Sequence, residues 1–462
     1  MGIISSLLRK NVDPNGQSVG QNQIDIELSS PAVNSTTTAE AEPNNSESSR
    51  NGRSEITNEE TNICRIFKVQ DLISDENIVQ SFKPKILSIG PYHHGSSSSH
   101  LEVTESVKLR CQRNILGSIS EDSYDGCRIT TRAKDFYSEK YITMGEENFA
   151  RMLLRDGCFI LAALGLMRGD LTQLEFEALP WHDVVHDLLL VENQIPFLVL
   201  EEIRMLAAPI PGETTESLKE KIAASVKVEL QHYTNAIDIR EIHSKDFHHL
   251  LHLCHMFFRP SQIAVEHHRA RAVTNLQWHR AVQYHEAGVE FRAKDPSTPH
   301  SLLDVTFSNG VMEIPRLSID GQTESLFKNL IMFELGCPQV GKYMNAYIIF
   351  MSQLLSKPDD VELLAQRGII EILGRADEVL RIFGRLNELA ILPCWDDYYL
   401  KSTLRSVGAH YNRRSNWWFA WLKHKHCKNP FLALAALGAF IVLLCTVIQA
   451  LFSVLQYFTP TK

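Results

Sequence analysis

A pair of neighbouring histidines in the stretch SIGPYHHG has the residue types for acid–base catalysis or for binding a metal ion. His93 and His94 follow Tyr92, and the Gly-Pro dipeptide before them favours a turn. Imidazole rings in a turn also hydrogen-bond the backbone and hold a loop in place. Because the turn follows FKPKIL, an expected strand or extended segment, we favour the structural role.

Glu192 is the acidic residue that could complete a catalytic site with these histidines. It opens the stretch ENQIPF directly after the apolar run LLLV, so its carboxyl group is expected to enter a core. Burial would raise its pKa and suit it for proton transfer. The alternative, which we favour, is that these polar side chains satisfy backbone groups at a helix end. An enzymatic site would require Glu192 within about 10 Å of His93 or His94, because acid–base partners act at hydrogen-bond range or through one water.

The His-rich segment HHLLHLCH offers metal chemistry. His248, His252 and His255 recur at positions i, i+4 and i+7, so they share one face of a helix. Three imidazoles could bind zinc if another element supplied the fourth ligand. Side chains at i, i+4 and i+7 of one straight helix cannot surround an ion without a ligand from another element. We therefore favour a His-rich, half-exposed helix and expect no cofactor.

Other motifs for chemistry are incomplete or missing from the sequence. The stretch from Gly336 to Tyr343, GCPQVGKY, approaches P-loop spacing, but it ends on Tyr343 in place of a small hydroxyl residue and follows an expected helix. No G-x-S-x-G, H-E-x-x-H or G-x-G-x-x-G motif occurs. Nine cysteines are scattered without a C-x-x-C pair, and the formal net charge of −9 gives no general attraction to nucleic acid.

The elements that would position these residues are mostly helical, within a globular region expected over residues 61–416. FARMLLRDGCFILAALGLM predicts a core helix, and VVHDLLLVENQIPFLVLEEIRML predicts two helical pieces separated at Pro196. VELLAQRGIIEILGRADEVLRIFGRLNELA predicts two helices interrupted by glycines. The alternating residues around Asn309-Gly310 predict a hairpin with a type I′ turn. The expected fold class is therefore mainly α (α+β), with a small β-hairpin element.

The two ends of the chain differ from this region in composition. Residues 1–60 are polar and without aromatic side chains, so we expect them to be disordered. Phe431 to Ile448 is a run of 18 uncharged residues that continues to Phe458, which predicts a single C-terminal transmembrane helix over residues 431–458. A basic, Trp-rich segment, 417–430, precedes it and places the globular region in the cytosol. We therefore expect a tail-anchored protein whose partner is the lipid bilayer, preferably at the plasma membrane.

Two positions fit lipid attachment. MGIISS places Gly2 in the pattern for N-myristoylation, and a chance match is the alternative. Cys427 lies on the basic flank of the apolar run, where palmitoylation occurs, although a plain buried or interfacial cysteine is the favoured interpretation.

Several separated motifs, in order, resemble those of the plant family of domain of unknown function 247 (DUF247, also called UPF0481). They are CRIFKV, FKPKILSIGPYHHG, MLLRDGCFIL, DLLLVENQIPFLVLE, LLDVTFSNGVMEIPRLSID and YNRRSNWW, followed by the apolar C-terminus. The chain departs from the family pattern at His252, where an acidic residue is common, and at His255. The resemblance implies a plant membrane protein without an established enzymatic activity. Certain grass members resemble pollen-side determinants of self-incompatibility, which implies a recognition module.

Together these observations favour a non-enzymatic recognition or scaffold protein. It would present a cytosolic helical domain to an unknown protein partner, and we expect no nucleic-acid partner. The alternative is an enzyme whose catalytic residues are His93, His94 and Glu192, with Tyr92 nearby.

Overall fold

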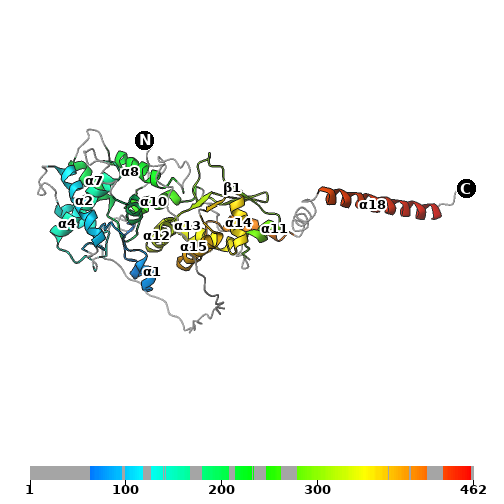
Figure 1. Cartoon of the computed structure of the whole chain (residues 1–462), viewed down its shortest axis with the longest axis horizontal. Coiled ribbons are helices and arrows are strands. Elements are labelled where there is room, and N and C mark those ends of the chain that lie inside the picture. Colours follow the sequence, from blue (N-terminus) through cyan, green and yellow to red (C-terminus); the bar gives the residue numbers. More distant parts are fainter. Residues whose placement is uncertain are drawn as a thin grey trace, which may run out of the picture. The chain divides into compact units, whose positions relative to one another are not determined.

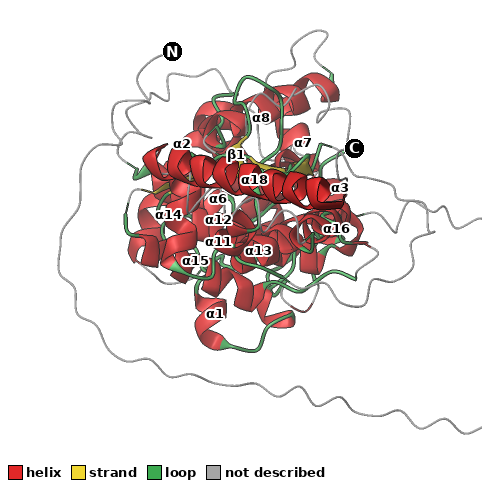
Figure 2. Cartoon of the chain, turned by 90° about the vertical axis from the view of Figure 1, so that its right-hand side faces the viewer, coloured by secondary structure: helices red, strands yellow, loops and turns green. Residues whose placement is uncertain are grey.

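Helices form most of the structure, and the strands are few and short (Figures 1 and 2). The chain divides into two units, Met1–Thr57 and Asn58–Lys462, and every residue described below belongs to the second. This is a computed structural model, and it describes residues 63–95, 99–117, 126–138, 140, 142–166, 179–207, 214–231, 233, 246–261, 278–372, 374–394, 397–413 and 430–458.

Helix α4 is the centre of a first group of helices. It packs against α2, α3 and α7 (Figure 1). Its apolar side chains occupy more than one face, so neighbours on several sides are needed to remove them from water. The elements of this part of the chain are η2 (Val69–Asp71), α1 (Glu76–Gln80), α2 (Ser99–Leu116), α3 (Gly126–Lys134), α4 (Glu146–Ala163), α6 (Trp181–Leu188), α7 (Phe197–Ala207), α8 (Thr215–Glu229) and α10 (Leu250–Phe258).

Helix α12 is the centre of a second group. It packs against α10, α13 and α15, and α10 also contacts α8, so α10 joins the two groups. The remaining elements are α11 (Ala281–Glu286), β1 (Glu290–Ala293), β2 (Thr306–Ser308), β3 (Val311–Ile314), β4 (Leu317–Ile319), α12 (Thr323–Gly336), η5 (Pro338–Val340), α13 (Tyr343–Leu354), α14 (Pro358–Gln366), β5 (Ile370–Ile372), α15 (Ala376–Leu389), α16 (Lys401–Tyr411) and α18 (Pro430–Phe458).

The predicted hairpin is confirmed. Strands β2 and β3 pair antiparallel, with Thr306 opposite Glu313 and Ser308 opposite Val311. Asn309 and Gly310 between them have φ values of 51° and 83°, as a type I′ turn requires. β1 extends this pair as a parallel strand on the other side of β3, and β4 pairs separately with β5.

A buried ion pair fixes α2 against α4. Lys108 on α2 is fully buried, and its Nζ lies 2.8 Å from Oδ1 of the equally buried Asp156 on α4. The same Nζ donates to the carbonyl oxygen of Ser88 and, at 2.6 Å, to Oε1 of Glu105. Every proton of the ammonium group therefore has an acceptor, which is the condition under which a buried charge is tolerated.

The fold prediction is wrong at the C-terminus. Residues Pro430–Phe458, which include Phe431, Ile448 and Phe458, do form a helix, α18. Within the part of the chain that the structure describes, however, no helix has both the length and the apolar character that crossing a bilayer demands. The transmembrane helix is therefore not supported, and the fold is mainly helical with a few small strands.

Two other predicted segments cannot be compared with the structure. The polar tail, 1–60, and residues 417–429 of the basic segment lie outside the described residues.

We expect Lys108→Met to lower the free energy of unfolding by about 3–5 kcal/mol, because it leaves the Asp156 carboxylate buried without its partner. The control is Arg151→Met, which removes an exposed pair with Glu147 on α4 and is expected to cost less than about 1 kcal/mol. Urea unfolding of the two variants measures the difference. Equal losses would contradict the central role of the buried pair.

Candidate functional site

The loop before SIGPYHHG is held by buried polar side chains and not by strand pairing. Oxygens of the Asp187 carboxylate accept hydrogen bonds from the consecutive backbone N–H groups of residues 85–87, at 2.8–3.0 Å. Asn193 Oδ1 accepts from Ile89 N at 2.7 Å, and its Nδ2 donates to Leu87 O at 2.8 Å. FKPKIL, predicted as a strand or extended segment, therefore forms no strand, and a side chain accepts the backbone N–H groups of its last three residues.

His93 and Glu192 lie together. His93 Nε2 is 3.0 Å from Glu192 Oε2, and both side chains are buried. The geometry at this nitrogen does not meet that of a hydrogen bond. The other carboxylate oxygen, Oε1, accepts from Val69 N at 2.6 Å. His93 therefore lies within the roughly 10 Å of Glu192 that an enzymatic site would require. The side chain of His94 is exposed.

The turn itself fits closely against the ENQIPF segment. Gly90 has a φ of 74°, and its N donates to Asp156 Oδ2 at 2.8 Å. A Cβ at this position would lie 2.6 Å from the backbone oxygen of Gln194. Tyr92 is buried, and its hydroxyl donates to Ile66 O at 2.8 Å. The stretch SIGPYHHG therefore joins the start of the globular region to the segment after α6.

His248, His252 and His255, the histidines predicted as metal ligands, lie at two separate sites. His255 Nε2 lies 2.8 Å from Oε1 of Glu334 on α12, and both are buried. Glu334 also accepts from Met344 N at 2.7 Å and from Asn345 N at 2.9 Å. His255 thus belongs to a polar cluster at the start of α13.

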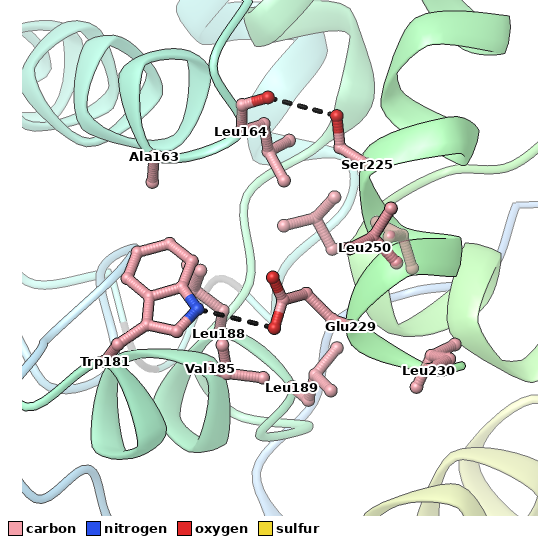
Figure 3. Close-up of a pocket in the computed structure, with 12 residues that line it drawn as sticks. Ala163, Leu164, Trp181, Val185, Leu188, Leu189, Ser225, Glu229, Leu230 and Leu250 are labelled. Atoms are coloured by element: carbon pink, nitrogen blue, oxygen red, sulfur yellow. Dashed lines mark hydrogen bonds between the residues drawn. The ribbon is translucent and has the colours of Figure 1, made fainter. Parts of the chain in front are cut away.

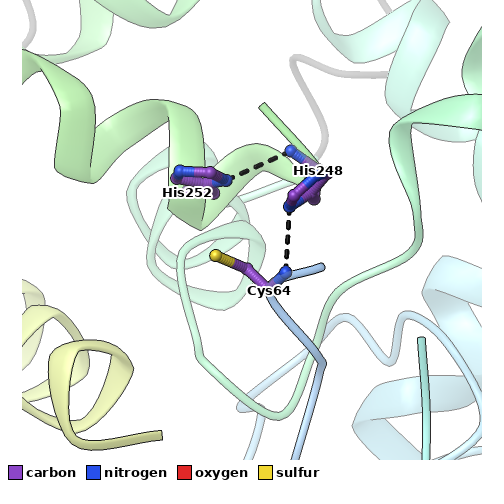
Figure 4. Close-up of side chains that lie close together, drawn as sticks. All are labelled: Cys64, His248 and His252. Atoms are coloured by element: carbon purple, nitrogen blue, oxygen red, sulfur yellow. Dashed lines mark hydrogen bonds between the residues drawn. The ribbon is translucent and has the colours of Figure 1, made fainter. Parts of the chain in front are cut away.

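His248 and His252 instead meet Cys64, the residue that opens the globular region (Figure 4). One ligand-type atom from each residue lies within 4.8 Å of the other two. His248 Nδ1 accepts from Cys64 N at 3.0 Å, and His252 Nδ1 accepts from His248 N at 3.2 Å. Sequence spacing gave no sign of Cys64, because the bond to His248 joins residues that are 184 positions apart.

The electrostatic environment of this cluster favours a thiolate at Cys64 and a neutral imidazole at His252. A hydrogen bond from Cys337, with contributions from His248 and His252, lowers the pKa of the Cys64 thiol. Burial lowers the pKa of His252. A thiolate beside neutral imidazoles is the protonation state in which these groups bind metal ions.

A separate apolar pocket opens between the end of α4, α6 and α8 (Figure 3). Its volume is about 210 Å³. The Trp181 indole and the Glu229 carboxylate face one another across it, and Nε1 donates to Oε2 at 3.3 Å. Burial raises the pKa of Glu229. The lining residues are otherwise almost all apolar: Ala163, Leu164, Val185, Leu188, Leu189, Val226, Val228, Leu230 and Leu250, with Ser225.

No sequence pattern points to this pocket. Trp181 and Glu229 are 48 positions apart, and neither belongs to a motif with a recognisable spacing. The predicted lipidation positions, Gly2 and Cys427, lie outside the described residues.

Comparison with known proteins gives a family but no function. A family model described as plant protein of unknown function, DUF247, matches residues 66–445. The chain is 26% identical over 445 residues to the UPF0481 protein At3g47200 of Arabidopsis thaliana, which covers 86% of this chain and 88% of that protein. No solved structure matches the chain.

We expect Gly90→Ala to lower the free energy of unfolding by about 2–5 kcal/mol, because the methyl group meets the Gln194 carbonyl in addition to the cost of the left-handed conformation. Gly95→Ala is the matched control: its φ is 75°, but nothing lies within 4 Å of the added carbon, so about 1–2 kcal/mol is expected. Thermal and urea unfolding compare the two. If Gly95→Ala lowered the free energy of unfolding as much as Gly90→Ala, the close approach to Gln194 would contribute nothing to stability.

Proposed function

The chain belongs to the DUF247 family of plant proteins of unknown function, and we propose that it is a recognition module whose apolar pocket between α6 and α8 holds one side chain of a partner protein. The observation that carries this proposal is the pocket itself, with apolar walls and a single carboxylate. Pockets of this kind at protein surfaces receive the anchor residues of partner segments.

The size of the pocket favours an anchor side chain over a metabolite. Sites for small molecules and cofactors usually enclose roughly 300–1,000 Å³. A cavity of about 210 Å³ has room for one large apolar side chain. Val228 lies at the rim with half of its surface exposed, so it is placed to contact the residues that flank such an anchor.

The charge of the pocket defines the chemistry of the partner segment. Glu229 is partly buried among apolar side chains, which makes its negative charge costly. A cationic group of the partner, close to the apolar anchor, would offset that cost and form a charge-assisted hydrogen bond. The segment we propose therefore carries a large apolar residue next to a Lys or Arg.

An enzymatic role for His93 and Glu192 is the second candidate, favoured by the 3.0 Å contact between them. Two observations weigh against it. Glu192 already accepts the backbone N–H of Val69, and neither the α6–α8 pocket nor the pocket beside it is lined by His93 or Glu192. We propose that the pair holds the start of the globular region in place.

A peptide-display selection on the full chain tests the recognition role. We expect enrichment of peptides in which a large apolar residue stands beside Lys or Arg. Val228→Lys should weaken their binding about tenfold or more, because it places a cation at the rim of the pocket. Met205→Lys is the matched control: Met205 on α7 is 59% exposed and does not line the pocket. Failure to enrich such peptides, or equal losses in both variants, would refute the proposal.

The pH dependence of peptide binding tests the part played by Glu229. The pKa of this carboxyl is raised by burial, and a cation stabilises only its ionised form. Affinity should therefore be full at neutral pH and fall as the pH decreases through that raised pKa. Glu229→Gln should weaken binding about tenfold and remove the pH dependence, since a hydrogen bond to a charged group contributes roughly 1.5–3 kcal/mol. Calorimetric titration with a selected peptide measures both, and an unchanged pH profile in the variant would exclude Glu229.

A further inference from the structure

The cluster of Cys64, His248 and His252 has the donor atoms and the spacing of a metal site. Thiolate sulfur and imidazole nitrogen are the ligands that Zn²⁺ prefers in tetrahedral protein sites. With the bond lengths typical of such sites, neighbouring ligand atoms stand roughly 3.3–3.8 Å apart. The three ligand atoms already lie within 4.8 Å of one another. Side-chain rotations that move each atom by less than about an ångström would complete the contact with an ion.

A second thiol lies next to this cluster. Nε2 of Gln339 is 3.5 Å from the sulfur of Cys64 and 3.7 Å from the sulfur of Cys337. Cys337 follows the last residue of α12 and is buried. The two sulfur atoms therefore share one hydrogen-bond donor, which places Cys337 beside the group of Cys64, His248 and His252 as a candidate fourth ligand.

We propose that Cys64, Cys337, His248 and His252 bind a zinc ion. The four ligands come from three parts of the chain: the segment before η2, the N-terminal end of α10, and the turn after α12. With four protein ligands the site is closed, so the ion has a structural role and not a catalytic one. It would fasten the start of the globular region to α10 and to the end of α12.

The exposure of the ligands would let an ion reach the site, and hydrogen bonds hold the imidazole rings in place. His248 is partly exposed, which leaves a path for the ion, whereas Cys64 and Cys337 are 1% exposed. Backbone N–H groups already orient both imidazole rings through Nδ1. A neutral imidazole has one free lone pair, so metal loading gives up these backbone hydrogen bonds: the ion takes the lone pair of Nδ1, or it binds Nε2 and the ring proton moves to Nδ1.

Cobalt is a spectroscopic probe for this site. The full chain, produced without a histidine tag and freed of metal with a chelator, is titrated with Co²⁺. We expect saturation at one ion per chain, an intense thiolate-to-cobalt charge-transfer absorption, the visible bands of tetrahedral Co²⁺, and displacement of the cobalt by Zn²⁺. Addition of Zn²⁺ to the metal-free chain should also raise its melting temperature, because the ion binds the folded state. A folded wild-type chain without the charge-transfer absorption would overturn the proposal.

Variants identify the ligands. Cys64→Ser should abolish the charge-transfer signal or leave only the part due to Cys337, and His252→Gln should weaken cobalt binding at least tenfold. The matched controls are Cys394→Ser and His182→Gln, which change an exposed cysteine and an exposed histidine outside the cluster. Circular dichroism establishes that each variant is folded. Cobalt binding that survives Cys64→Ser unchanged, or that is lost equally in the controls, would show that the metal binds elsewhere.

Discussion

The need to satisfy buried backbone groups without secondary structure is the constraint on which this fold depends. Residues 85–90 enter the core as a loop and are buried from Leu87 onward, so their N–H groups have no partners in a ladder or a helix. Asp187, Asn193 and Asp156 provide acceptors for five of these groups. Each unsatisfied group in such a place would cost about 1–3 kcal/mol. The positions of α4, α6 and the loop are therefore fixed together.

Buried acidic side chains also accept backbone N–H groups in the second group of helices. Glu334 accepts the first backbone N–H groups of α13, and Asp360 accepts Val282 N at 2.9 Å and Lys357 N at 2.9 Å. The first N–H groups of a helix lack partners within it, and a carboxylate also interacts favourably with the helix dipole. Acidic side chains that look suited to catalysis are thus placed where backbone donors would otherwise be unsatisfied. Buried carboxylates are for this reason poor markers of an active site in this protein.

Local patterns predicted local structure well, whereas long-range pairings could not be foreseen. The hairpin followed from Asn309-Gly310, because it depends on backbone geometry within a few residues. Helix α7 begins directly after Pro196, whereas α6 already ends at Leu188, so the non-helical segment between them was not predicted. The segment GIIEI was predicted as part of a helical run, but Ile370–Ile372 forms β5, since β4 offers it a parallel partner 53 residues earlier in the chain. The meeting of Cys64 with His248 had no signal in spacing. A hydropathy pattern at the C-terminus gave a membrane span that the described helix does not support.

The segment that opens the globular region has a consequence for the timing of folding during synthesis. Cys64, Ile66 and Val69 leave the ribosome first, yet their partners include His248, which is made 184 residues later. At about 5–20 residues per second, the segment waits roughly 10–40 s for that partner. Ile66 N meets its acceptor on Phe136 much sooner, whereas Gln339 arrives after 275 residues. The beginning of the domain is thus among its last parts to reach its final place, and until then its apolar side chains are exposed to any chaperone near the ribosome.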